Sequence, residues 1–126
     1  MAAHRFRDDR ALRARRFARL TSPYRRRVND PTRERADEYE AYNYDVGIKP
    51  LIEKALGVQT FREDRETESE FMTISYWEDV AAMSRFAGDD PKQIHHLARD
   101  PEFLVELPDG VQVLQIRSSL GDTGGA

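Results

Sequence analysis

Two adjacent histidines, His95 and His96, are the side chains best suited to acid–base chemistry in the main part of the sequence. Imidazole is the usual proton acceptor near neutral pH, so either histidine is a candidate catalytic base. Neighbours on a helix point in different directions, so the pair cannot chelate one metal ion, and the spacing offers no third ligand. Two solvated histidines at the edge of a core would give the same pattern, and that alternative stays open.

Two phenols and an amide form a second group of candidates. Tyr39, Tyr42 and Asn43 are spaced to share one face of an expected helix. They could converge on a bound ligand. The tyrosine rings could instead pack in the core with their hydroxyls reaching water, because a buried tyrosine needs only one polar partner.

Trp77 and Arg62 lie on expected strands. Trp77 could seat a helix on the sheet or border a cavity. Arg62 could stabilise a phenolate or a carboxylate, or it could pair with Glu63, Glu66 or Glu70 at the surface, which is the commoner fate of such charges.

Composition removes several classes of chemistry. Cysteine is absent, which excludes disulfides, thiol nucleophiles, thiolate metal sites and iron–sulfur clusters. The sequence has no Gly-rich phosphate loop, nucleophile elbow or zinc-helix motif. No run approaches the roughly 18 apolar residues of a membrane span, and the Arg-rich start lacks the apolar core of a secretory signal. We therefore expect a cytoplasmic protein with no metal site and no membrane partner.

Turn and capping signals divide the chain into short elements. Asp30-Pro31 is typical of a helix start, and Gly47 is placed to end that helix. The expected elements are a strand at 24–28, a helix at 31–46, a short helix at 49–56, strands at 58–64 and 70–77, a helix at 79–87, short helices after Asp90-Pro91 and Asp100-Pro101, and a strand at 111–117.

The order of the main elements predicts an α+β fold of the ferredoxin-like split βαββαβ type, with an antiparallel sheet and helices on one face. The expected strand at 70–77 carries bulk on both faces, since Met72, Ile74 and Tyr76 alternate with other large side chains. Helices can cover only one of these faces. A second copy of the sheet is the simplest cover for the other, which predicts a homodimer.

Charge divides the chain into unequal parts. Residues 1–30 hold ten Arg and three Asp, a charge of +7, so the rest carries −10 within a net charge of −3. We expect a basic arm at 1–22, a domain at 23–118 and a Gly-rich tail at 119–126. Base-stacking aromatics are not interleaved with the arginines of the arm, so the sequence does not predict a nucleic-acid partner.

One run of residues resembles a known family. Residues 74–88, ISYWEDVAAMSRFAG, are similar to the segment of the antibiotic-biosynthesis-monooxygenase (ABM) family in which a strand ends in Trp and a helix ends in Phe-Ala-Gly. Upstream, 36–39 and 57–62 resemble the first helix and second strand of that family. The resemblance covers Thr32 to Ile116. It implies a dimeric α+β barrel with a cavity between each sheet and its own helices.

The resemblance also implies a reaction. Cofactor-free members of this family oxidise aromatic or polyketide-like molecules with dioxygen, which requires a base, a donor to the phenolate and a dry pocket. On this hypothesis His95 or His96, with Tyr42 or Asn43, handles the proton and the phenolate. The cavity would be walled by Trp77 and Phe86, and the substrate would also meet Tyr39 and Arg62.

Two other functions stay open. One is a barrel that binds a small ligand without catalysis. The other is haem binding, because haem-degrading relatives carry a histidine at the spacing that separates Trp77 from His96. Those relatives have a Trp where this sequence has Phe86, and their first-strand Asn has no counterpart here. The first strand departs further from the family, since 24–28 reads YRRRV where an apolar, Trp-containing segment is usual.

Overall fold

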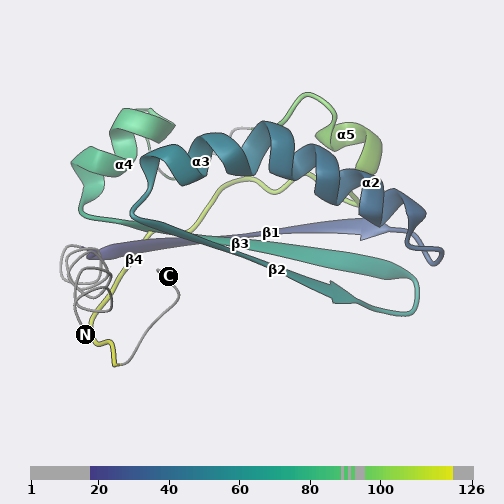
Figure 1. The fold of residues 1–126 in the computed structure, drawn as a ribbon, viewed down its shortest axis with the longest axis horizontal. Coiled ribbons are helices and arrows are strands. Elements are labelled where there is room, and N and C mark those ends of the chain that lie inside the picture. The colour runs from purple at the N-terminus through teal and green to yellow at the C-terminus, as the bar shows by residue number, and fades with distance from the viewer. Residues whose placement is uncertain (1–17, 89, 91, 93–95, 121–126) are drawn as a thin grey trace, which may run out of the picture.

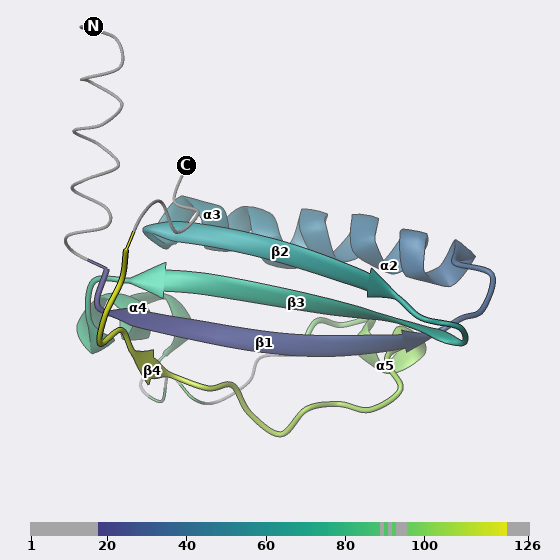
Figure 2. The same cartoon turned by 90° about the horizontal axis from the view of Figure 1, so that it is seen from below.

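The computed structural model describes residues 18–88, 90, 92 and 96–120. The predicted basic arm up to residue 17 and the end of the tail, 121–126, lie outside the described residues. Strands β1 (Leu20–Asn29), β2 (Gly57–Asp64), β3 (Glu68–Trp77) and β4 (Leu114–Gln115) form one sheet in the order β2-β3-β1-β4. All neighbouring strands run antiparallel (Figure 2). This confirms the α+β, ferredoxin-like split arrangement.

The helices lie over one face of the sheet. They are α2 (Glu34–Asn43), the π-helix η1 (Tyr44–Ile48), α3 (Lys49–Lys54), α4 (Val80–Ala87) and α5 (Asp100–Phe103). Figure 1 shows α2 and α5 at one end of the sheet and α3 and α4 at the other. The described helices therefore leave the second face of the sheet without a helical layer.

Strand β1 is longer than predicted. It begins at Leu20, so the expected strand at 24–28 was too short and the domain start at residue 23 falls inside β1. Leu20 is buried against Trp77 and Met83, and the Arg19 amide donates to the Trp77 carbonyl at 2.8 Å. The arginines make the strand hard to recognise in the sequence, because charged residues are unusual in a strand core. Its inward side chains nevertheless follow the two-residue period of a half-buried strand.

The first helix also departs from the prediction at both ends. It begins at Glu34 and not at Pro31, because the Asp30 carboxylate accepts the amides of Thr32, at 2.9 Å, and Arg35. Gly47 does not end the helix. The chain continues through it as the π-helix η1 and then as α3. Insertion of a π turn preserves helical hydrogen bonding where a glycine would otherwise stop it.

The later elements follow the sequence signals in part. Asp79 caps α4 by accepting the Ala82 amide at 2.8 Å, and Gly88 ends the helix with φ 96°. The helix predicted at Asp100-Pro101 forms as α5. A short helix was also predicted after Asp90-Pro91. Its first residues lie partly outside the described residues, and residues 96–99 are not helical. The strand predicted at 111–117 forms only as β4, a two-residue strand.

Two apolar clusters hold the helices to the sheet. One, at the α2 and α5 end, comprises Val28, Ala36, Tyr39, Phe71 and Phe103. The other, at the α3 and α4 end, comprises Leu20, Trp77 and Met83. Each cluster contains residues of both β1 and β3, so helices pack on the two central strands at two separate places along their length. No helix within the described residues is long and apolar enough to cross a membrane.

Candidate functional site

A cavity separates the two apolar clusters. Along the inner face of β1, Ser22, Tyr24 and Arg26 stand between Leu20 and Val28, and on β3 Thr73 and Ser75 stand between Phe71 and Trp77. Serine and threonine are too small to fill the space that the larger cluster residues fill on either side. The sheet therefore has a recess under the helices at the middle of its length.

This cavity encloses about 230 Å³, slightly less than pockets that hold drug-sized ligands. Its walls come from β1, β3, the α2–η1–α3 run, α4 and two loop positions. The described lining residues are Ser22, Tyr24, Arg26, Asn43, Val46, Gly47, Ile48, Pro50, Leu51, Thr73, Ser75, Trp77, Met83, Phe86, Ala87, Leu97 and Val111.

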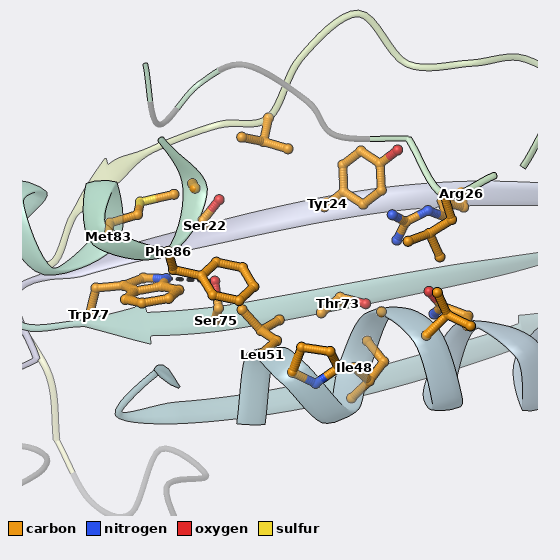
Figure 3. Close-up of a pocket in the computed structure, with 17 residues that line it drawn as sticks. Ser22, Tyr24, Arg26, Ile48, Leu51, Thr73, Ser75, Trp77, Met83 and Phe86 are labelled. Atoms are coloured by element: carbon orange, nitrogen blue, oxygen red, sulfur yellow. Dashed lines mark hydrogen bonds between the residues drawn. The ribbon is translucent and has the colours of Figure 1, made fainter. Parts of the chain in front are cut away.

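One end of the cavity is aromatic and apolar. The Trp77 ring is 2% exposed, and its centroid lies 5.7 Å from that of Phe86. Its indole N–H donates to the Ser75 hydroxyl at 2.8 Å, so the buried polar atom of the ring is satisfied within the wall. Figure 3 shows Trp77, Phe86, Met83 and Leu51 gathered at this end. Such a surface suits the flat, apolar part of a ligand.

The other end is polar. The Arg26 guanidinium carbon lies 3.9 Å from the centroid of the Tyr24 ring, and both side chains lie at this end in Figure 3. Three buried atoms here have no hydrogen-bond partner: the Tyr24 hydroxyl, Arg26 Nε and Asn43 Oδ1. Burial raises the pKa of Tyr24 against the opposing charge of Arg26, so the phenol keeps its proton. Buried polar groups are normally hydrogen-bonded, so these three atoms call for a partner.

Asp100 lies behind Arg26 and is completely buried. Its Oδ1 accepts the Tyr39 hydroxyl at 2.9 Å, and its Oδ2 accepts the Leu97 amide at 2.9 Å. Arg26 Nε stands 3.8 Å from Oδ2, close enough for charge attraction and too far for a hydrogen bond. Burial raises the pKa of Tyr39, and the neighbouring Asp100 charge reinforces this effect against that of Arg26.

Gly47 brings the helical wall close to the polar end. A Cβ at this position would lie 2.9 Å from Asn43 Oδ1 and 3.2 Å from Leu97 Cδ1. The π-helix η1 therefore presents bare backbone where a side chain would enter the cavity. π-Helical turns are frequent at functional sites, and this one shapes the recess.

Three predicted site residues line the cavity, and two predicted tyrosines do not. Asn43, Trp77 and Phe86 are part of the wall. Tyr39 packs in the core, and the Tyr42 hydroxyl accepts the Arg99 amide at 2.9 Å while its ring stacks on a core phenylalanine. The two phenols therefore do not converge on the cavity, and Tyr39 is fully buried whereas Tyr42 is half-buried. Each is held by a protein partner, because each ring faces the α5 end of the core.

Arg62 lies away from this cavity. It pairs with Asp37 at 2.7 Å, Glu40 at 3.0 Å and Asp64 at 2.8 Å. The predicted pairs with Glu63, Glu66 and Glu70 were wrong, because Arg62 is on the helix-facing side of β2 and meets the acids of α2. Its ion pairs with Asp37 and Glu40 join α2 to the sheet edge.

Neither predicted histidine is placed in the cavity. His96 is exposed and is not among the described lining residues, and His95 lies outside the described residues. The described part of the wall contains no histidine that could ligate haem iron. Within the described residues, no three His, Cys, Asp or Glu side chains are grouped to hold a metal ion.

Asn43 is the one predicted site residue at the polar end. Arg26 and Asp100 are not among the predicted site residues, since the sequence shows them only as part of a basic stretch and as a helix start. The signal was present in the spacing, because Ser22, Tyr24, Arg26 and Val28 alternate with outward residues and so face the helices together.

Comparison with known proteins supports the fold alone. No protein-family model and no curated protein matches the chain. A crystal structure of the NE2512 protein of unknown function from Nitrosomonas europaea is similar, with a TM-score of 0.50 and 15% sequence identity over 86% of this chain and 98% of that one. At that identity the likeness carries no information on activity.

The Tyr39–Asp100 hydrogen bond can be tested by stability. Replacement Tyr39→Phe removes the donor to a buried carboxylate, so we expect the free energy of unfolding to fall by about 1–3 kcal/mol. Tyr44→Phe, at a half-exposed position on the next helical turn, is the control and should change it by no more than about 0.5 kcal/mol. Urea unfolding followed by circular dichroism measures both values; equal losses in the two variants would contradict a special role for Tyr39.

Proposed function

We propose that this protein binds a small aromatic molecule in the cavity between its sheet and its helices. The observation that carries the proposal is the division of the cavity wall into an aromatic end, with Trp77 and Phe86, and a polar end with three buried, unpartnered atoms. An apolar pocket with a few convergent polar groups is the usual form of a small-molecule site.

Trp77 supplies the readout, because it is the single tryptophan of the sequence and forms part of the wall. Titration with hydrocinnamate, hydrocinnamamide and naphthol should change its fluorescence in a saturable way. Gly47→Leu should raise the Kd of each bound compound about tenfold or more, because the new side chain occupies the cavity. Isothermal titration calorimetry gives the affinities independently of the tryptophan.

The matched control is Ala81→Leu, which adds the same side chain to an exposed position of α4 outside the wall. Its affinities should equal those of the wild type. Binding that survives Gly47→Leu unchanged would place the ligand elsewhere and contradict the proposal.

Cofactor-independent oxidation of such a ligand is the second candidate function. Its support is the charge of Arg26 at the polar end, because a nearby cation lowers the pKa of a phenol and favours the phenolate. The electron-rich phenolate reacts with dioxygen: a CH₂ group and O₂ give a carbonyl group and water, with the electrons supplied by the substrate. The proton acceptor on this hypothesis is His95, whose position lies outside the described residues.

Oxygen uptake with a dihydroxyanthrone tests this candidate. The wild type should consume oxygen faster than the spontaneous reaction, with the quinone formed in equal amount. Arg26→Gln should raise the pKa of the bound phenol, so less phenolate forms at a given pH. Oxygen uptake should slow about tenfold for each unit of that rise, and the pH–rate profile should move to higher pH. A rate equal to the spontaneous one leaves binding as the function and rejects the oxygenase.

The second face of the sheet supports a homodimer, which we propose as the state in solution. Pro23, Met72, Ile74 and Tyr76 share this face, together with Phe61 and Leu114, which are 45% and 43% exposed. A two-fold axis brings the same surface of two copies together, and a second copy of this face would cover its apolar side chains.

Ile74→Glu tests the dimer. A carboxylate in the middle of the apolar face would be buried without a partner, so we expect the molar mass from light scattering to fall from two chains to one. Ile52→Glu, exposed on α3 over the opposite face, is the control and should leave the mass unchanged. A wild-type protein with the mass of one chain would reject the dimer.

A further inference from the structure

Arg26 is the one charged residue among the described side chains that line the cavity. It lies on the helix-facing side of β1, and its side chain is only 10% exposed. A buried cation must be paired with a negative charge and must have acceptors for its N–H groups, or it is too costly to keep. Arg26 has a negative charge nearby in Asp100, but its Nε–H has no acceptor.

Asp100 balances the charge of Arg26 and leaves its hydrogen bonds unmade. Each Asp100 oxygen accepts one hydrogen bond, Oδ1 from the Tyr39 hydroxyl and Oδ2 from the Leu97 amide. The nearest approach to Arg26, 3.8 Å from Oδ2 to Nε, exceeds hydrogen-bond length. Arg26 Nε is buried with no acceptor, although a guanidinium carries five N–H donors in a planar fork.

The neighbours of Arg26 hold it in place for a ligand. Its guanidinium carbon lies 3.9 Å from the centroid of the Tyr24 ring, a cation–π contact that helps to hold the group in place. The Tyr24 hydroxyl is a further buried group without a partner, at the same end of the cavity. A planar, doubly oxygenated anion would accept from the fork in two places and could also accept from this phenol.

We propose that Arg26 binds an oxyanion of the ligand, a carboxylate or a phenolate, and that Asp100 is the positioning residue behind it. This assignment rests on the proposed binding function and names its substrate class: a small aromatic acid whose ring lies against Trp77 and Phe86. The Tyr39–Asp100 hydrogen bond keeps the carboxylate facing Arg26 and away from the cavity, so the ligand meets positive charge alone.

Hydrocinnamate and its neutral amide form a matched pair for the carboxylate. By Trp77 fluorescence the wild type should bind the acid about tenfold to a hundredfold more tightly than the amide, the range of a charge-assisted hydrogen bond. Arg26→Gln should remove this preference, because the acid then loses the charge-assisted hydrogen bond that distinguishes it from the amide. Arg26→Lys should keep part of the preference, since an ammonium retains the charge and lacks the fork.

The matched control is Arg25→Gln, the same change one residue earlier on β1, where the side chain is 60% exposed on the opposite face of the sheet. It should keep the full preference. Because Arg26→Gln leaves Asp100 buried and unpaired, the double variant Arg26→Gln, Asp100→Asn is the second test. It removes both charges and should also bind the two compounds equally.

Para-nitrophenol tests the phenolate, because its two protonation states differ in visible absorption. The wild type should lower the pKa of the bound phenol, and the Arg26→Gln variant should not. A preference for hydrocinnamate alone would assign the site to carboxylates, and a lowered phenol pKa alone would assign it to phenolates. Equal binding of acid and amide by the wild type, with no phenol shift, would overturn the assignment and leave the binding function. Failure of every compound to bind would overturn both.

Discussion

The buried carboxylate of Asp100 is the constraint on which this fold depends. It joins three parts of the chain that are distant in sequence: the Tyr39 hydroxyl on α2, the Leu97 amide before α5, and the charge of Arg26 on β1. A carboxylate with no exposed surface is tolerated only when its oxygens are bonded and its charge is balanced. The position of α5, and of the loop that closes one wall of the cavity, follows from satisfying that one group.

The cavity exists because the core is divided. Both central strands carry large apolar residues near their ends and small or polar ones between, so the helices rest on two supports with a recess in the middle. A sequence selected only for stability would fill such a recess, since each missing methyl group weakens the packing. Ser22, Thr73 and Ser75 leave it open, and Gly47 keeps the facing helical wall thin. The open space and the buried cation both belong to the cavity in which we propose that a ligand binds.

The sequence predicted more of the fold than of the candidate site. The alternating side chains of β2 and β3 and the Asp79 cap of α4 depend only on residues that are close in sequence. The elements predicted from them are present in the structure. The failures involve partners distant in sequence. The arginines of β1 obscured a strand whose inward-facing Arg26 is paired with Asp100. Gly47 was expected to end a helix that instead continues through it as η1, with Leu97 close by. Arg26 was missed for the same reason: its role is set by residues about 75 positions away.

Strand β3 contributes side chains both to the cavity and to the uncovered face of the sheet, because its residues alternate between the two faces. Thr73, Ser75 and Trp77 face the cavity, while Met72, Ile74 and Tyr76 face the uncovered side. Because adjacent residues point to opposite faces, a change on one face leaves the other chemically intact. The backbone of β3 is nevertheless common to both. Association on the uncovered face would hold β3 rigid beneath the cavity, so the ordering cost of ligand binding would be lower in a dimer than in a monomer.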